Sequence, residues 1–254
     1  MADLIYEVRG LRKSFEGKVV LDGIDLSLRR GETLALLGPS GCGKSIFLKC
    51  LVGLVRYDAG EVLFDGSSVA AMDDAHLVAL RRRVGLMFQY NALFDSMTVG
   101  ENTAYGLHER LGGSMSEREI AARVDEALAA VGMAGTQDLK PPELSGGMRK
   151  RVGLARTMAL RPEVILYDEP TMGLDPVNTH RIDDIIRDLH VRYGIASIMV
   201  THDMKLAFHV SDRIAMMLEG RIVGCDTPDR MREHPDERVR DFITGTDHAV
   251  LPDV

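Results

Sequence analysis

The sequence contains no run approaching about 18 consecutive apolar residues, the length expected of a membrane-spanning helix. Its first residues, MADLIYEVRG, carry acidic side chains where a secretory signal would begin with basic ones and continue into an apolar stretch. We therefore expect a chain that neither spans a membrane nor is exported. An apolar content of 45% over 254 residues is enough for a buried core, so a globular protein is predicted.

Cysteine is scarce, and an excess of basic charge is missing. The three cysteines, Cys42, Cys50 and Cys225, match neither a disulfide framework nor a zinc-binding pattern, which suits a reducing compartment. A formal net charge of −7 argues against a broad nucleic-acid-binding surface. One local basic cluster is expected to be a solvated helix face rather than a track for a phosphate backbone: Arg149, Lys150, Arg151 and Arg156.

Internal repeats, low-complexity tracts and dividing linkers are also absent from the sequence, so a single domain is expected over residues 1–254. Helix signals dominate from about residue 90 to residue 162, where Ser116 and Glu119 have the spacing of a capping box. This stretch is predicted to be a helical insertion. From about Pro235 the chain alternates acidic and basic residues, as expected of a partner-binding extension or of a frayed end.

The remaining apolar patterns predict strands. Ile24, Leu26 and Leu28 alternate with polar residues, which is typical of a half-exposed antiparallel strand, and the run TLALL after them predicts a buried one. EVILYDEP and IASIMVTHD predict two further buried strands, joined by an amphipathic helix over residues 179–192. This β-helix-β order indicates a parallel sheet. DRIAMMLEGRIVGCD predicts a hairpin that turns at Glu219-Gly220.

One motif predicts a nucleotide site. GPSGCGKS fits the pattern G-x-x-x-x-G-K-[ST] and lies between a predicted buried strand and a predicted helix, as this motif requires. Backbone amides of such a loop surround a phosphate, the lysine bridges two phosphate groups and the serine hydroxyl binds Mg²⁺. The predicted nucleotide-binding residues of this segment are Gly38, Pro39, Ser40, Gly41, Cys42, Gly43, Lys44, Ser45 and Ile46.

Polar residues at the ends of other predicted strands complete this site. Asp168 is placed to reach the metal, directly or through a water molecule. Glu169 follows it and is expected to orient or deprotonate the attacking water, because a second acid on the metal would crowd it. His202 closes the next strand and is expected to contact the γ-phosphate. Gln89 is expected to join the metal or the water to the helical insertion.

A second glycine-containing helix start lies far beyond the phosphate loop, in the stretch PPELSGGMRKR. Ser145 precedes Gly146 and Gly147, and the free amides of a helix N-terminus attract anions. These residues are therefore a second candidate phosphate contact, and the residues alone leave open whose phosphate it is.

In order and spacing, the phosphate loop, Gln89, LSGGM, ILYDE, GLD at residues 173–175 and His202 resemble the ATP-binding subunits of ABC transporters. The resemblance extends over nearly the whole chain. It implies an α/β fold: a P-loop ABC ATPase core with an antiparallel β subdomain and an inserted α-helical subdomain. It also implies ATP and Mg²⁺ as cofactors, and catalytic roles for Lys44, Glu169 and His202.

In that family two subunits pair head to tail. The resemblance therefore implies that Ser145, Gly146 and Gly147 address the γ-phosphate held by a second copy of the chain. Asp175 would lie across the dimer interface, and Phe15 would stack on adenine. By this implication Ser45, Gln89 and Asp168 serve the metal.

Three residues depart from the commonest family pattern. Ile46 stands where a threonine usually follows the serine, and the missing hydroxyl is expected to weaken ATP binding by about 1 kcal/mol. Met148 replaces a glutamine at the end of LSGGM, which puts a side-chain contact to the partner's nucleotide in doubt. Phe15 replaces a tyrosine and keeps the ring.

Shorter stretches resemble one branch of the family. ALFDSMTVGEN, the methionine-ended signature and the tail RVRDFITG look like the Mla-type ATPases of bacterial phospholipid trafficking, which work with MCE-domain proteins. This implies a peripheral homodimer at the cytoplasmic face of the inner membrane, an integral membrane permease, a STAS-domain protein as a further partner, and no nucleic acid. Leu93, Phe94 and Met97 would receive a short permease helix or pack the insertion's own core.

Three alternatives remain beside this interpretation. An importer ATPase for amino acids or another small solute would share every catalytic residue. A soluble ABC ATPase acting on DNA is disfavoured by the acidic charge and by the lack of sustained heptads between Lys44 and Asp168. A scaffold that does not hydrolyse ATP is disfavoured by Glu169.

Overall fold

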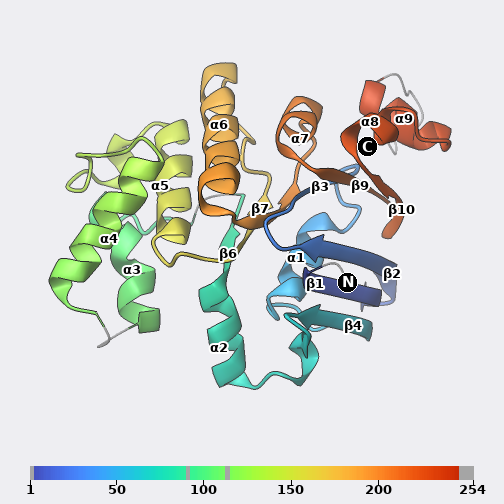
Figure 1. Cartoon of the computed structure of the whole chain (residues 1–254), viewed down its shortest axis with the longest axis horizontal. Helices are drawn as coiled ribbons and strands as arrows, with labels where there is room; N and C mark the ends of the chain where they lie inside the picture. The colour runs from blue at the N-terminus through green and yellow to red at the C-terminus, as the bar shows by residue number, and fades with distance from the viewer. Residues whose placement is uncertain (1–2, 90–91, 112–114, 246–254) are drawn as a thin grey trace.

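The computed structural model describes residues 3–89, 92–111 and 115–245, and its two β-sheets are visible in Figure 1. The antiparallel sheet has the strand order β2-β1-β4-β5, and the larger, mainly parallel sheet has the order β10-β9-β3-β8-β7-β6. The strands are β1 (Leu4–Phe15), β2 (Lys18–Arg29), β3 (Thr33–Leu37), β4 (Ala59–Phe64), β5 (Ser67–Ser68), β6 (Val84–Met87), β7 (Val164–Asp168), β8 (Ala196–Val200), β9 (Arg213–Leu218) and β10 (Arg221–Asp226).

Helices surround these sheets, and those of the insertion gather at one end of the molecule (Figure 1). They are α1 (Lys44–Leu51), α2 (Asp74–Arg83), α3 (Val99–Leu111), α4 (Glu117–Ala130), α5 (Gly146–Met158), α6 (Pro176–Tyr193), α7 (Met204–Val210), α8 (Pro228–Arg232) and α9 (Glu237–Thr244), with short 3-10 turns η1 (Val69–Ala71) and η2 (Pro141–Glu143). No helix among the described residues is long and apolar enough to cross a membrane.

The strand predictions are confirmed. Strand β2 pairs antiparallel with β1 and buries Ile24, Leu26 and Leu28, as the alternation predicts. Strands β3, β7 and β8 are buried at every position and pair in parallel, with β8 between the other two. The hairpin β9-β10 turns at Glu219-Gly220, where both residues have positive φ. Because parallel strands end at the same edge of a sheet, the segments that follow β3, β6, β7 and β8 meet there.

The helical insertion contains α3, α4 and α5. The capping box of Ser116 and Glu119 is present at the start of α4, and the apolar face of that helix is buried. Helix α6 begins at Pro176, three residues before the predicted start, because Asp175 caps it and proline suits the first turn. Tyr90 and Asn91, where the insertion was expected to begin, lie outside the described residues.

The C-terminal segment folds onto the larger sheet as far as it is described. Helices α8 and α9 follow β10, and Val239 of α9 is fully buried against the core. Phe242 and Ile243 pack beside it. Most of the stretch from Pro235 to residue 245 is thus a docked helix, while residues 246–254 of the expected extension lie outside the description.

One expectation is wrong in part: Arg149 of the basic cluster on α5 is exposed, but Lys150 is not solvated. Lys150 is only 4% exposed, and its Nζ donates hydrogen bonds to two backbone carbonyls. The three arginines also donate to backbone carbonyls. Arg149 donates to that of Pro141, and Arg151 to those of Val131 and Gly132. Arg156 donates to that of Ala92. Charge alone suggested solvent, but each cation has backbone carbonyl oxygens within reach, and such hydrogen bonds compensate for the partial or full burial of Lys150, Arg151 and Arg156.

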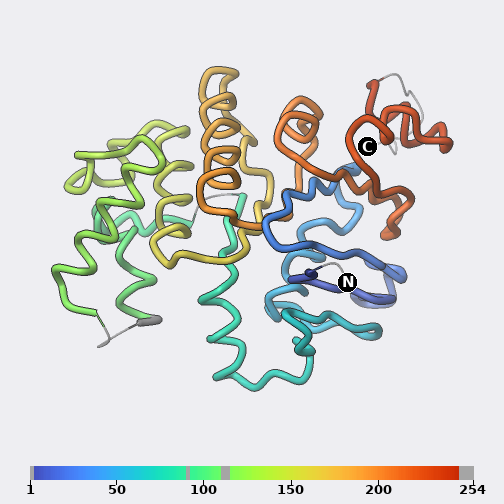
Figure 2. Tube along the Cα trace, in the orientation of Figure 1, coloured from blue at the N-terminus to red at the C-terminus, as the bar shows by residue number. Residues whose placement is uncertain are grey.

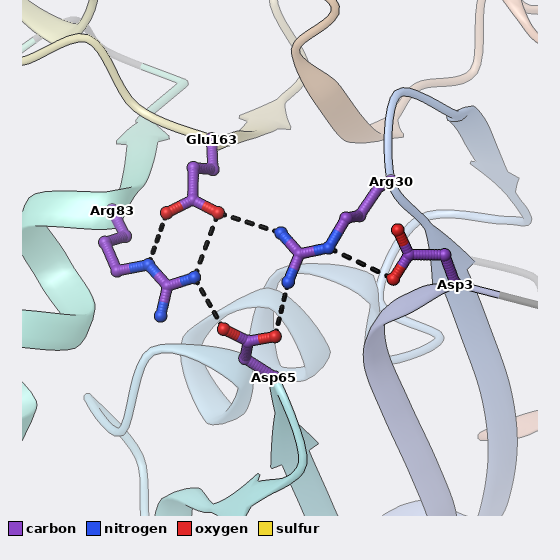
Figure 3. A network of polar contacts seen from close by, with 5 residues as sticks. All are labelled: Asp3, Arg30, Asp65, Arg83 and Glu163. Carbon is purple, nitrogen blue, oxygen red and sulfur yellow. Dashed lines mark hydrogen bonds and ion pairs between the residues drawn. The ribbon is translucent and has the colours of Figure 1, made fainter.

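A network of ion pairs joins the two sheets at the opposite end of β7 from Asp168 (Figure 3). Arg83, at the end of α2, bonds both Glu163 before β7 and Asp65 after β4. Arg30, in the turn between β2 and β3, bonds the same two carboxylates and also Asp3. A shared network of this kind fixes the orientation of the antiparallel sheet against the nucleotide-binding core more firmly than isolated surface pairs would.

Asp183 of α6 is a buried carboxyl group whose Oδ1 has no hydrogen-bond partner among the described residues. Burial, followed by the charge of Asp203 at the start of α7, raises its pKa to about 6, against the weaker opposing effect of His180 and His209. The folded chain therefore binds this proton more tightly than the unfolded chain. The stability that the neutral form contributes is present below about pH 4 and is lost as the pH rises to about 6.

Asp183→Asn should raise the free energy of unfolding by about 1 to 2 kcal/mol at about pH 7.5, because the amide carries no charge to bury. The gain should disappear at about pH 4, where the native carboxyl is already neutral. Urea denaturation at both pH values measures this, with Asp188→Asn on the exposed face of the same helix as the control. An equal gain at both pH values would show that burial of charge is not the cause.

Candidate functional site

A cavity of about 340 Å³ opens at the carboxyl edge of the parallel sheet, beside the phosphate loop. Most of its lining residues are ones that the sequence predicts: Ser40, Gly41, Gly43, Lys44, Ser45, Ile46, Gln89, Glu169 and His202. Three further lining residues were not predicted: Val20, Met172 and Val200. The structure thus brings together residues from β2, the phosphate loop and the ends of β6, β7 and β8.

Backbone crowding explains a glycine of the phosphate loop. Gly43 precedes α1 in a left-handed conformation, with φ of 110°. A Cβ atom at this position would lie only 2.7 Å from the carbonyl oxygen of Val20 on β2. Gly43 therefore lets the loop fold tightly enough to direct its amides, and the N-terminus of α1, into the cavity.

Lys44 is held by its own loop. Lys44 is only 7% exposed. Its Nζ donates hydrogen bonds to the carbonyl oxygens of Gly38 at 2.6 Å and Pro39 at 2.8 Å. The Cys42 sulfur lies 3.9 Å from the same ammonium, and burial raises the pKa of this thiol. Gly38, Pro39 and Cys42 thus position the lysine instead of lining the cavity.

Ser45 and Asp168 meet although 123 positions separate them in the sequence. The hydroxyl of Ser45 donates to Oδ1 of Asp168 at 2.8 Å, and Asp168 is itself 7% exposed. Hydroxyl and carboxylate oxygens are the ligands that Mg²⁺ prefers. The two side chains therefore fit the predicted metal, which their oxygen atoms would share with phosphates of the nucleotide.

Glu169 and His202 form a pair beside the phosphate loop. Oε2 of Glu169 lies 2.9 Å from Nδ1 of His202. The backbone of Glu169 is left-handed, with φ of 51°, a conformation that non-glycine residues adopt mainly where the surroundings impose it. Its amide donates to the carbonyl of Val200 at 2.9 Å. This geometry turns the carboxylate from the end of β7 toward the end of β8, where it can accept a proton from water in the cavity.

Gln89 enters the cavity from the end of β6. Its side-chain nitrogen contacts the sulfur of Met172, which follows β7 and is 45% exposed. Gln89 and Met172 therefore form one wall, between the helical insertion and the strand that carries Asp168 and Glu169.

Ser145, Gly146, Gly147 and Asp175 do not line this cavity and instead form a second group at the starts of α5 and α6. Ser145 caps α5 by accepting a hydrogen bond from the amide of Met148, and the side chain of Met148 packs against the core. These helix starts form an exposed edge apart from the phosphate loop.

One asparagine links the two helix starts. A Cβ atom at Gly147 would lie 2.5 Å from Oδ1 of Asn178, so only glycine allows this contact. Nδ2 of Asn178 donates to Asp175, whose carboxylate also accepts two backbone amides of α6. The Asn178 side chain, then these amides, lower the pKa of Asp175. Asp175 therefore stays ionised and fixed in direction.

Phe15 lies at the end of β1, 44% exposed, with the ammonium of Lys13 4.9 Å from its ring centre. It is not among the residues that line the cavity, so its stacking on adenine stays a prediction. For Leu93, Phe94 and Met97, the structure shows packing against the core at the first position only, and the docking of a permease helix stays a prediction. Leu93 packs against the core, Phe94 is 40% exposed beside the ring of Tyr105, and Met97 lines a groove of about 440 Å³ between α3 and α4.

Sequence reasoning missed Lys150, Val20, Met172 and Asn178. A signal for Lys150 exists in the sequence, because Gly147, Lys150 and Leu154 share a helical face that is buried. Val20, Met172 and Asn178 take their roles from chain segments that come together only in the folded structure.

A sequence profile described as ABC transporter matches residues 21–172, which is more than half of the chain. The chain belongs to this family and is an ATPase cassette of it. The matched region extends from β2 through the phosphate loop to Met172 after β7, and it contains most of the residues that line the cavity, although Val20, Val200 and His202 lie outside it.

Several curated relatives are similar over most of the chain. The probable ribonucleotide transport ATP-binding protein mkl of Mycobacterium tuberculosis is 39% identical over 94% of this chain, which spans 66% of that protein. A sulfate/thiosulfate import protein, CysA of Xanthomonas campestris, is 43% identical over 89% of this chain and 64% of its own length. The chloroplast protein TRIGALACTOSYLDIACYLGLYCEROL 3 of Arabidopsis thaliana is 40% identical over 96% of this chain and 75% of its own.

A solved dimer of an ATP-binding cassette, in a post-hydrolysis state with ADP and phosphate, superposes with a TM-score of 0.81. It is 30% identical, and the match covers 88% of this chain and 98% of that one. The cbiO1 protein of Clostridium perfringens, part of a transporter complex, superposes with a TM-score of 0.83 at 31% identity, covering 91% of this chain and 92% of its own. Fold class and family predicted from the sequence are thereby confirmed.

Proposed function

We propose that the chain hydrolyses MgATP as a homodimer and powers phospholipid trafficking through an integral membrane permease. The main support for a dimer is the separation of the site residues into two groups. The phosphate loop, Glu169 and His202 share one cavity, whereas Ser145, Gly146 and Asp175 are exposed and are not among the residues that line it. A second copy, arranged head to tail, supplies the missing side of each cavity.

Within each cavity the residues have distinct tasks. Lys44 and the loop amides hold the β- and γ-phosphates, while Ser45, Asp168 and Gln89 serve the metal, which neutralises phosphate charge when bound. Glu169 orients or deprotonates the water, and His202 holds the Glu169 carboxylate while facing the γ-phosphate. The N-terminus of α5 completes the site from the partner, and contributes roughly 0.3 to 2 kcal/mol toward an anion. Hydrolysis removes that contact and lets the dimer reopen.

The dimer can be tested on Glu169→Gln protein, which should bind ATP and stall before hydrolysis. Light scattering after size exclusion should show a dimer with MgATP and a monomer without it. Adding Ser145→Arg should abolish the dimer without weakening ATP binding, because the new side chain blocks the α5 N-terminus and leaves the Lys44 cavity intact. A dimer that survives this change would contradict the composite site.

Two features support a membrane partner. The groove beside Met97 and Tyr105 is lined mainly by apolar groups between α3 and α4, and Phe94 is exposed next to it. A short amphipathic helix of a permease fits such a groove. The relative named for a galactolipid supports a lipid as substrate, as do ALFDSMTVGEN and RVRDFITG in this sequence. Partners with MCE and STAS domains, and a place at the cytoplasmic face of the inner membrane, belong to the same proposal.

A small-solute importer is the second candidate, and the 43% identity to a sulfate/thiosulfate import protein favours it. The two can be separated by purifying the membrane complex through a tag on this chain. We expect phospholipid to co-purify, and MgATP to drive its transfer between vesicles with the native chain but not with Glu169→Gln. ATP-driven uptake of sulfate or an amino acid, without lipid transfer, would contradict the lipid proposal and leave the ATPase intact.

A further inference from the structure

Lys150 connects α5 to Gln89 and Glu169, two of the residues that line the cavity. Its Nζ donates to the backbone carbonyl of Gln89 at 2.8 Å and to that of Glu169 at 3.2 Å. These carbonyls belong to the segments that follow β6 and β7. One buried ammonium on the helical insertion therefore holds both segments of the nucleotide-binding core.

The backbone at these segments is strained and needs such support. Glu169 has φ of 51° and Ala92 has φ of 46°, the left-handed region that side chains with a Cβ rarely adopt. Arg156, less than two turns after Lys150 on α5, donates to the carbonyl of Ala92 at 2.7 Å. A cation from α5 thus reaches each strained residue, and such conformations persist only where their surroundings hold them.

The burial of Lys150 also makes its hydrogen bonds energetically necessary. Burial lowers its pKa, while the nearby charges of Glu169 and Asp168 oppose that shift. Burying an amine is unfavourable unless it makes compensating hydrogen bonds. Here the compensation comes from the two carbonyls, so the position of the ammonium and the positions of Gln89 and Glu169 depend on one another.

The start of α5 is the part of the chain that would meet the partner's ATP. Ser145 and Lys150 lie less than two turns apart on this helix, and Figure 2 shows it as one continuous coil beside α6. A regular helix moves as a unit, so a displacement of its first turn is passed on to Lys150.

We propose that Lys150 is a positioning residue that aligns Glu169 and Gln89 according to where α5 is seated, and so links hydrolysis in one subunit to the partner's γ-phosphate. This inference rests on the proposed function, because the γ-phosphate reaches α5 only in the head-to-tail dimer. Lys150 itself acts through backbone carbonyls and does not touch the nucleotide.

The test compares steady-state ATP hydrolysis by the full-length native chain with Lys150→Met, Lys150→Arg and Arg149→Met. Methionine keeps the length of the side chain but cannot donate, so kcat should fall about ten- to a hundredfold while KM changes less than about threefold. Arginine should recover part of the loss. Arg149→Met is the matched control, because the side chain of this exposed neighbour donates to the carbonyl of Pro141 and, within the part of the chain that the structure describes, to neither Gln89 nor Glu169, so its kcat should be unchanged.

The same Lys150→Met change in Glu169→Gln protein should leave MgATP-dependent dimer formation intact. An unchanged kcat would overturn the inference. So would a joint loss of kcat, ATP affinity and thermal midpoint that arginine does not relieve, because that pattern belongs to a general packing defect. A Glu169→Gln parent that never dimerises would overturn the proposed function, and the link between subunits with it.

Discussion

The burial of three parallel strands is the constraint on which the rest of the molecule depends. Strands β3, β7 and β8 are buried along their whole length, so their register against one another is set by the core. The residues that follow them then have to meet at one edge. This brings Ser45 within hydrogen-bonding distance of Asp168, and Glu169 within hydrogen-bonding distance of His202. Chemistry at this edge is a consequence of hydrophobic packing beneath it.

Helix α5 relates that edge to the surface of a second subunit. Its first turn carries Gly147, which fits against Asn178, and its second turn carries Lys150, which bonds the carbonyls of Gln89 and Glu169. A single rigid element therefore contacts both groups of site residues, although they share no cavity. The residues proposed to close the dimer and the lysine proposed to align the reacting groups thus lie in the first two turns of one helix, so a binding event at an exposed edge can act on a buried reaction centre.

Most of the fold and most of the cavity could be predicted from the sequence, for identifiable reasons. Strand burial, the capping box at Ser116 and the phosphate loop depend on local periodicity and spacing, which the sequence records directly. Lys150 was misjudged because charge was weighed above its place on a buried face. The glycine at position 147 could be predicted as a helix-start residue, but not the reason for it, which is the approach of Asn178 from another helix. Such contacts depend on tertiary geometry and leave no local pattern.

Mixing two inactive variants tests the central claim, that each ATP site is built from two chains, most directly. Lys44→Ala removes the lysine from a chain's own cavity, and Ser145→Arg blocks the helix start that serves the partner's cavity. In a mixed dimer both defects fall on the same composite site, and the other site is intact. ATP hydrolysis by the mixture should therefore exceed that of either variant alone at the same total concentration. A mixture no more active than its components would contradict a site shared between subunits.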